Sequence, residues 1–368
     1  MKKAFLVFGL LVFCFLIQVS PAAPAVPGKL DLKALDDAVN QILKAEQIPG
    51  LALSIAFPDG KQINRCYGKA DLENQAPVGE NSVFEIGSVS KLFTALAVMK
   101  LKEEGKLKVT DPLTKYFPQY PNWSGITIKN LLQHTSGIPD LTGLEPIKSN
   151  QMEDRTPQES LAIIGNAPLE FEPGQRAKYS NSGAILLGLI VEKASGVPFA
   201  DYLRQVITQP LGQTTTRSGS NLALIPGRVS GYHLEGSSLQ NAPYASLVMP
   251  YSSGGMVSSA ADLVKLEKAL NPGVLLKAET LNEMFAPCRL NDGSVGMISP
   301  QVSFGYCLEL VKFEPQNFTP TKNGEISGFN AVYCRFADPR VSVALASNRD
   351  GSTNALYKIA IKICRMLK

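Results

Sequence analysis

Histidine is scarce in this sequence of 368 residues, which contains only His134 and His233. A zinc hydrolase site and a Ser-His-Asp triad both depend on imidazole groups, so the sequence offers few residues for either kind of site. Cysteine is also sparse, and none of the six cysteines forms a Cys-x-x-Cys pair or lies at metal-ligand spacing from a histidine. We therefore expect no metal and no other cofactor.

The N-terminus combines two lysines, Lys2 and Lys3, with the apolar run AFLVFGLLVFCFLIQV and the small-residue stretch SPAAPA. This three-part plan is typical of a secretory signal peptide, which we place over residues 1–25. An uncleaved membrane anchor is the alternative, although the run is a little short of the ~20 residues that a span needs. We expect a periplasmic or secreted protein after cleavage.

The charged residues are nearly balanced, with 36 Lys and Arg against 32 Asp and Glu. Removal of Lys2 and Lys3 with the signal would lower the net charge from +4 to +2, which gives no indication of a nucleic-acid partner. The remaining chain, residues 26–368, is long enough for a sizeable core. We expect one domain, a monomer, and a small-molecule or peptide substrate.

Strand patterns cluster at both ends of the chain. Near the N-terminus, a helical pattern over residues 30–45 precedes LALSIAF and QINRCYG, which form a hairpin across PDGK. Near the C-terminus, FGYCLELV, NAVYCRF and VSVALAS are predicted strands, and residues 354–367 a closing helix. We therefore predict an α/β (α+β) fold: an antiparallel sheet built from both chain ends and flanked by helices, with an inserted, mostly helical lobe and a cleft at the boundary.

The stretch FEIGSVSKLFTALAVMK carries one lysine in its middle, Lys91, among residues that are apolar on nearly every side. A helix that is apolar all round is normally buried, and a buried ammonium without a partner costs several kcal/mol or gives up its proton. Ser88 precedes Lys91 by three residues, which places both side chains on one helix face. A lysine whose pKa is lowered by burial can activate such a serine as a nucleophile. The Ser-x-x-Lys pattern is weak alone, but the buried context makes both residues catalytic candidates.

Tyr179, Ser180 and Asn181 stand just before an apolar helical run that starts at Ala184. A phenol and an amide at a helix entrance can point into one cleft, where the phenol shuttles a proton and the amide holds a lysine or a substrate amide. An ordinary helix cap beside a packed tyrosine is the alternative.

Lys322, Asn323 and Gly324 lie in extended sequence that leads into a strand. The glycine would let a substrate backbone approach the strand edge closely, and the lysine could receive a carboxylate. A solvated turn is the alternative, because Lys-x-Gly is a common pattern.

Together with LLQHTSGIPD at residues 131–140 and SSGGMVSSAADLVKL at residues 252–266, these motifs resemble those of the serine β-lactamase-like hydrolases, the family of class C β-lactamases and DD-peptidases. The resemblance covers residues 30–368 and implies a β-lactamase/transpeptidase-like fold. It also implies that Ser88 is the acylated nucleophile and that Lys91 helps to deprotonate it.

By the same resemblance, Tyr179 shares the base role and passes the proton to the leaving group, while Asn181 contacts Lys91 and the substrate amide. The backbone amides of Ser88 and Glu325 would form the oxyanion hole. His134 would be a hydrogen-bonded loop residue rather than a catalyst.

One position departs from the family pattern. Where β-lactamases carry Lys-Thr-Gly or Lys-Ser-Gly, this chain has Lys322-Asn323-Gly324. The hydroxyl that helps to bind a substrate carboxylate is replaced by the amide of Asn323, which donates from a longer arm. The sequence also lacks a Ser-Asp-Asn triplet, which argues against the class A type.

We therefore expect a serine hydrolase that forms an acyl-enzyme on a β-lactam or a D-amino-acid peptide. Lys322 favours a substrate with a carboxylate, whereas Asn323 leaves open a carboxylesterase that acts on neutral esters. A third alternative is a non-catalytic peptidoglycan-binding or sensing protein on the same fold, although binding alone does not need a buried base.

Overall fold

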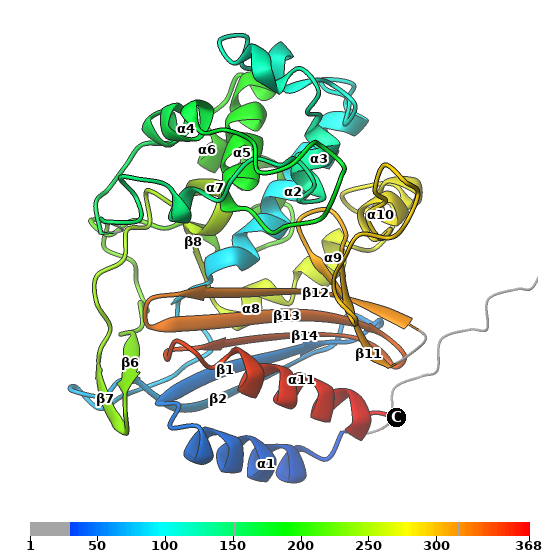
Figure 1. Ribbon diagram of the computed structural model, residues 1–368. Coiled ribbons are helices and arrows are strands. Elements are labelled where there is room, and N and C mark those ends of the chain that lie inside the picture. Colours follow the sequence, from blue (N-terminus) through cyan, green and yellow to red (C-terminus); the bar gives the residue numbers. More distant parts are fainter. Residues whose placement is uncertain (1–29, 151, 315–316) are drawn as a thin grey trace, which may run out of the picture.

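The computed structural model describes residues 30–150, 152–314 and 317–368. The predicted signal peptide, residues 1–25, lies outside the described residues. Within the described part, the chain forms a nine-stranded antiparallel sheet with helices on both faces and a helical lobe beyond one of them (Figure 1). The predicted fold class is thereby confirmed.

The large sheet takes its strands from both ends of the chain. In spatial order they are β3 (Ala76–Pro77), β2 (Gln62–Asp71), β1 (Gly50–Ala56), β14 (Arg340–Ser347), β13 (Phe329–Ala337), β12 (Asn317–Ile326), β11 (Glu309–Glu314), β10 (Val302–Phe304) and β9 (Met297–Ser299). The two chain ends meet where β1 pairs with β14, with Leu53 opposite Leu345. The predicted hairpin and the two last predicted strands are therefore confirmed.

The predicted strand over FGYCLELV is wrong in its first half. The segment instead forms the end of β10, a turn and the start of β11. The N–H of Gly305 donates to the carbonyl of Leu308 at 3.0 Å, which closes the turn. Cys307 has a left-handed φ of 56°, a conformation that a strand cannot continue through. As a result, Glu309 begins β11 opposite Thr321 of β12.

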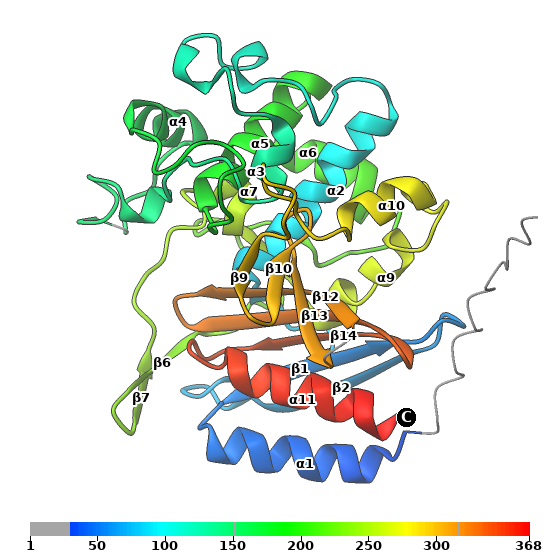
Figure 2. The same cartoon turned by 45° about the vertical axis from the view of Figure 1, so that its right-hand side comes forward.

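Two terminal helices, α1 (Leu32–Ala45) and α11 (Thr353–Met366), cover one face of the sheet (Figure 2). Helix α1 buries Leu35, Val39 and Leu43, which recur at helical spacing and belong to the core beneath the sheet. This layer supports the face opposite the helical lobe.

The helical lobe covers the other face. Its α-helices are α2 (Ser90–Glu103), α3 (Ile128–Leu132), α4 (Pro157–Asn166), α5 (Asn181–Ser195), α6 (Phe199–Leu203), α7 (Tyr251–Gly254), α8 (Ala260–Leu263), α9 (Leu266–Ala269) and α10 (Ala278–Met284). Smaller strand groups are β4 (Phe84–Glu85), β8 (Met256–Ser258) and β5 (Arg217–Ser218), and the hairpin of β6 (Tyr232–Glu235) with β7 (Ser238–Asn241). Helix α2 is buried nearly all round, as its apolar sequence predicts.

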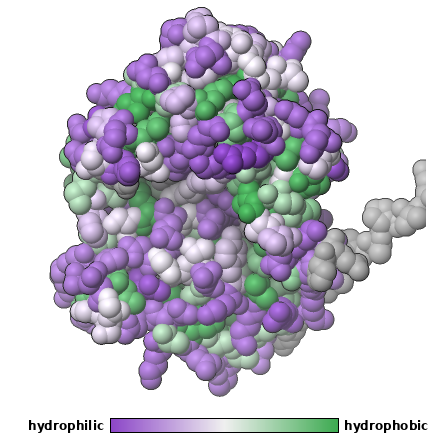
Figure 3. All heavy atoms as spheres, viewed as in Figure 1, coloured by the Kyte–Doolittle hydropathy of each residue, from purple (hydrophilic) through white to green (hydrophobic). Residues whose placement is uncertain are grey.

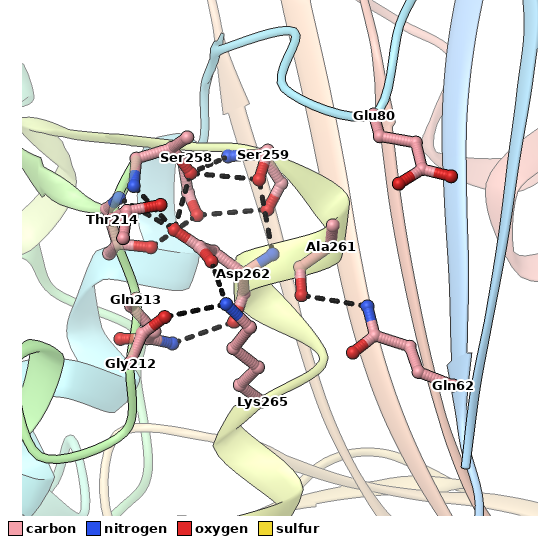
Figure 4. A network of polar contacts seen from close by, with 12 residues as sticks. Gln62, Glu80, Gly212, Gln213, Thr214, Ser258, Ser259, Ala261, Asp262 and Lys265 are labelled. Carbon is pink, nitrogen blue, oxygen red and sulfur yellow. Dashed lines mark hydrogen bonds and ion pairs between the residues drawn. The ribbon is translucent and has the colours of Figure 1, made fainter.

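A network of polar contacts ties the lobe to the sheet (Figure 4). Asp262 of α8 is buried and accepts hydrogen bonds from the N–H of Thr215 and from Nζ of Lys265, both at 2.6 Å. On its other side, Gln62 of β2 donates to the carbonyl of Ala261 at 3.0 Å. Helix α8 is therefore held by the lobe and by the sheet at once.

No single helix among the described residues is long and apolar enough to span a membrane. Helix α5 and the helical segment Phe199–Thr208 reach that length and apolarity only together, across a bend of 79°.

Candidate active site

A cavity of about 830 Å³ lies between the helical lobe and β12. Its walls include Ser88 just before α2, Tyr179 and Asn181 at the start of α5, and Asn323 and Glu325 on β12. Figure 3 shows the molecular surface hollowed between the lobe and the sheet. The cleft that the sequence predicted at this boundary is therefore present.

Ser88 lies in a short 3-10 helix, η1 (Gly87–Val89), that runs directly into α2. Gly87 has a left-handed φ of 46°, and a Cβ at this position would lie 2.8 Å from the backbone nitrogen of Glu325. The hydroxyl of Ser90 donates to the carbonyl of Gly87 at 2.7 Å. This tight, bonded turn places Ser88 at the entrance of a buried helix, facing the cavity.

Lys91 lies in the first turn of α2 and is completely buried. Its Nζ donates to Oδ1 of Asn181 at 2.7 Å, to the carbonyl of Ser253 at 2.6 Å and to Oγ of Ser88 at 3.0 Å. Two of these three acceptors are carbonyl oxygens, which cannot donate a hydrogen bond. When Lys91 gives up a proton, its two remaining N–H groups can stay on the carbonyls. The nitrogen lone pair is then left for the hydroxyl of Ser88.

The surroundings lower the pKa of Lys91 to about 7. The largest cause is burial, which removes water from the ammonium, and the second is repulsion from Lys322. Near neutral pH, a sizeable fraction of Lys91 is therefore uncharged and able to accept a proton. This explains why a lysine lies in the buried first turn of α2.

Tyr179 approaches Ser88 with its phenol, whose oxygen lies 2.6 Å from Oγ of Ser88. Burial is the main cause that raises the pKa of this phenol, so the hydroxyl stays protonated near neutral pH. Two lysine nitrogens lie over its ring, with Nζ of Lys91 at 4.8 Å and Nζ of Lys322 at 5.3 Å from the centroid. Tyr179 can therefore donate a proton beside the serine.

Asn181 is oriented by Asp140, a residue that the sequence analysis did not single out. Asp140 accepts from the backbone N–H of Asn181 at 2.7 Å and from its side-chain amide at 3.0 Å. Because the amide nitrogen faces Asp140, Oδ1 of Asn181 is left to accept from Lys91. Asp140 is the last residue of the LLQHTSGIPD segment. The motif was therefore noted in the sequence, but the contact between Asp140 and Asn181 was not.

His134 lies in the same segment and is buried. Its Nδ1 accepts from the N–H of Ser180 at 3.3 Å, and its ring centroid lies 4.8 Å from that of Tyr179 and 4.6 Å from that of Phe304. Burial, followed by the nearby Lys91, lowers the pKa of His134 well below its usual range. A neutral, hydrogen-bonded imidazole fits the loop role that the resemblance implied.

Gly324 lets β12 approach the start of α2. A Cβ at this position would lie 2.0 Å from the carbonyl oxygen of Ile86 and 2.7 Å from the backbone nitrogen of Ser88. No side chain fits in this space. The contact brings the backbone amides of Ser88 and Glu325 into neighbouring segments at the cavity wall, the arrangement that an oxyanion hole needs.

Lys322 is not open to the cavity. Its side chain is 1% exposed, and its Nζ donates to Oε1 of Glu309 at 2.5 Å. Glu309 and Asn323 line the cavity in its place. Glu309 was not among the site residues predicted from the sequence, although it is the only charged residue in FGYCLELV, the same kind of signal that singled out Lys91.

Within the described part of the chain, no group of three or more His, Cys, Asp or Glu side chains is arranged to hold a metal ion. The five cysteines in this part, from Cys66 to Cys364, are all free.

The family model described as Beta-lactamase matches residues 35–362. Penicillin-binding protein 4* of Bacillus subtilis (strain 168) is 30% identical over 310 residues, which are 80% of this chain and 66% of that protein. The chain thus spans just under two thirds of this relative's length.

Two solved structures agree with the sequence comparison. The D-amino acid amidase from Ochrobactrum anthropi SV3, complexed with D-phenylalanine, has a TM-score of 0.77 and 26% identity, covering 91% of this chain and 98% of that chain. The penicillin binding protein from Bacillus halodurans has a TM-score of 0.76 and 26% identity, covering 88% and 99%. The resemblance found in the sequence is confirmed, and the chain belongs to the Beta-lactamase family of serine hydrolases.

Proposed function

We propose that the protein hydrolyses an amide or ester through an acyl-enzyme formed at Ser88, with a β-lactam or a D-amino-acid peptide as one substrate class and a neutral ester as the other. The observation that carries this proposal is the contact between Nζ of Lys91 and Oγ of Ser88 at 3.0 Å. Because the other two partners of Lys91 are carbonyl oxygens, its neutral form has its lone pair directed at the serine.

In the first step, the neutral amine of Lys91 takes the hydroxyl proton of Ser88 while Oγ forms a bond to the substrate carbonyl carbon. The carbonyl oxygen becomes an oxyanion, and the backbone N–H groups of Ser88 and Glu325 donate to it. Such donors typically contribute several kcal/mol to acyl transfer.

In the second step, the bond to the leaving group breaks. Tyr179 is placed to give the leaving group its proton, since its hydroxyl lies 2.6 Å from Oγ of Ser88 and is protonated near neutral pH. The proton on Lys91 then restores the phenol, and attack by water on the acyl-enzyme releases the acid and regenerates Ser88.

Different observations support the two substrate classes. The relatives named penicillin-binding protein, and the neighbour named D-amino acid amidase, support a peptide-like or amide substrate. The pairing of Lys322 with Glu309 supports the neutral ester, because a paired lysine offers less charge to a substrate carboxylate. A non-catalytic binding protein is disfavoured, because a buried lysine with a pKa of about 7 beside a serine serves no purpose in binding alone.

Mass spectrometry of the intact protein tests the proposal. The protein is mixed with a panel of β-lactams, peptides ending in D-Ala-D-Ala and short-chain esters, and quenched in acid at short times. We expect a mass increase equal to the acyl group of at least one class, absent from Ser88→Ala. If no compound of the panel modifies the wild type and none is hydrolysed by it, the proposal is refuted.

We further propose that the mature protein is a monomer and is periplasmic or secreted, as the sequence analysis expects. Light scattering of the purified protein and N-terminal sequencing of the protein recovered from the expressing cells test these two points. A stable oligomer, or an intact N-terminus at Met1, would contradict them.

A further inference from the structure

The charged side chains on the described wall of the cavity are both acidic. They are Glu309 at the start of β11 and Glu325 on β12. The carboxylate of Glu325 accepts from Nδ2 of Asn330 at 3.0 Å and from Oγ1 of Thr353 on α11 at 3.4 Å, which leaves Glu309 as the charge next to Lys322. Lys322, which the sequence analysis expected to receive a substrate carboxylate, lies behind this wall with 1% of its side chain exposed. Among the described residues, the wall of the cavity therefore offers no free positive charge to a substrate carboxylate.

Glu309 neutralises Lys322. Its Oε1 accepts from Nζ of Lys322 at 2.5 Å, a distance at which each charge largely cancels the field of the other. Glu309 is also held in place, because its backbone pairs with Thr321 and its side chain is 12% exposed. The second carboxylate oxygen, Oε2, is buried and has no hydrogen-bond partner within the described part of the chain. A substrate carboxylate brought to Lys322 would have to lie beside this fixed negative charge.

The ion pair lies on the side of the leaving group. Tyr179 protonates the leaving group in the proposed mechanism, and Nζ of Lys322 lies 5.3 Å from the centroid of the Tyr179 ring. A leaving group that reaches the hydroxyl of Tyr179 is therefore close to Glu309 and Lys322. The Glu309–Lys322 pair therefore interacts most directly with a charge on the leaving group.

Asn323 adds a neutral contact at the same place. It lines the cavity one residue after Lys322, and its amide can both donate and accept a hydrogen bond. Such a group suits an uncharged amide or hydroxyl as well as it suits a carboxylate.

We propose that Glu309 is a specificity-determining residue that restricts the site to amides and esters whose leaving group is uncharged or cationic. This inference rests on the proposed acylation of Ser88. It disfavours peptides with a free C-terminal carboxylate next to the scissile bond, and β-lactams, which carry a carboxylate on the corresponding side. Neutral amides and esters are the expected substrate class.

A matched series of three esters tests the inference. All three share a phenylacetyl group, and their leaving groups are 3-hydroxybenzoate, 3-hydroxybenzamide and 3-(aminomethyl)phenol, which carry a negative, zero and positive charge. We expect the wild-type kcat/KM, corrected for spontaneous hydrolysis, to be about tenfold lower for the carboxylate ester than for the carboxamide ester. A carboxylate ester that is hydrolysed as fast as the carboxamide ester, or faster, would overturn the inference.

The variant Glu309→Gln removes the charge while keeping the shape of the side chain. We expect the ratio of kcat/KM between the carboxamide and carboxylate esters to fall about tenfold in this variant. The matched control is Glu314→Gln, which removes a 63% exposed carboxylate from the same strand, where it pairs with Lys368 outside the cavity. The control should keep the wild-type ratio, and a folded Glu309→Gln that also keeps it would exclude Glu309 as the selecting residue.

The failure of this inference is distinguishable from the failure of the proposed function. If no ester acylates the wild type above the level of Ser88→Ala, as read by intact mass, the proposed function fails. If all three esters acylate Ser88 with the same efficiency, the proposed function stands and the charge selection is wrong. If Glu309→Gln does not fold, the relative kcat/KM values of the wild type for the three esters decide the question alone.

Discussion

The Nζ of Lys91, in the buried first turn of α2, lies 3.0 Å from Oγ of Ser88. The side chain of this lysine is completely buried, and its other two donors are fixed on the carbonyls of Asn181 and Ser253. The only proton that the neutral amine can take without losing a hydrogen bond is the one on Ser88.

Lys91 and Tyr179 should act as one unit in proton transfer. Both contact the same oxygen of Ser88 and pass a proton from the serine to the leaving group, so removing either interrupts the same relay. We expect Lys91→Met and Tyr179→Phe each to slow acylation by about 10²- to 10⁴-fold. The double variant should be little slower than the worse single one. Acylation rates from stopped-flow or quenched mass spectrometry check this, with Lys44→Met on α1 as a control; strictly multiplicative losses would show two independent roles.

Acylation should rise with pH through about 7 and then level off, because only the neutral form of Lys91 accepts the proton of Ser88. Lys322 is one cause of the lowered pKa, and Glu309 acts in the opposite direction. Lys322→Met removes the first and keeps the second, so the rising limb should move to higher pH. The pH profile of kcat/KM with a neutral ester measures this. A limb that stays at the same pH in the variant would mean that Lys91 is not the titrating base.

Much of this site could be predicted from the sequence, because its main residues are separated by short, regular spacings. Ser88 and Lys91 lie one helical turn apart, and Tyr179 and Asn181 lie two residues apart at a helix start, so local geometry already places each pair together. The two chain ends that form the sheet were also visible, since their strands have strong apolar patterns.

Asp140 should be a positioning residue. It accepts two hydrogen bonds from Asn181, and its negative charge also raises the pKa of Lys91 against the effect of burial. We expect Asp140→Asn to lower kcat by about tenfold to a hundredfold through misplacement of Asn181. The rising limb of the pH profile should also move to lower pH, which loss of a purely structural contact would not cause. Asp201→Asn on α6 is the control, and an unmoved limb in Asp140→Asn would contradict the role.

Gly324 should be intolerant of any side chain. A Cβ there would lie 2.0 Å from the carbonyl oxygen of Ile86, so β12 must shift away from η1. We expect Gly324→Ala to lower the free energy of unfolding by about 1–3 kcal/mol and to reduce acylation more than stability alone explains. Gly125→Ala is the matched control, since a Cβ at Gly125 meets no atom within 4 Å. Denaturant unfolding and acylation rates of the two variants make the comparison; equal behaviour would refute the close approach.

The charge state of the Lys322 region could not be predicted, because it depends on contacts between strands. Glu309 lies 13 residues before Lys322, and the two meet only because a turn at Cys307 starts β11 at Glu309. A strand drawn continuously through FGYCLELV gives no reason to place Glu309 at this point. The contact of Asp140 with Asn181 is likewise one of tertiary structure, 41 residues apart in the chain.

The most direct test of the account is the identity of the acylated atom. Wild type, Ser88→Ala and Ser90→Ala are treated with a fluorophosphonate probe, and the modified residue is identified by intact mass and peptide mapping. Ser90 is the matched control because it lies two residues away and points its hydroxyl at the carbonyl of Gly87 instead of the cavity. The account predicts one adduct at Ser88 in the wild type and in folded Ser90→Ala, and none in Ser88→Ala. Equal labelling of wild type and Ser88→Ala, or an adduct mapped to another residue, would contradict it.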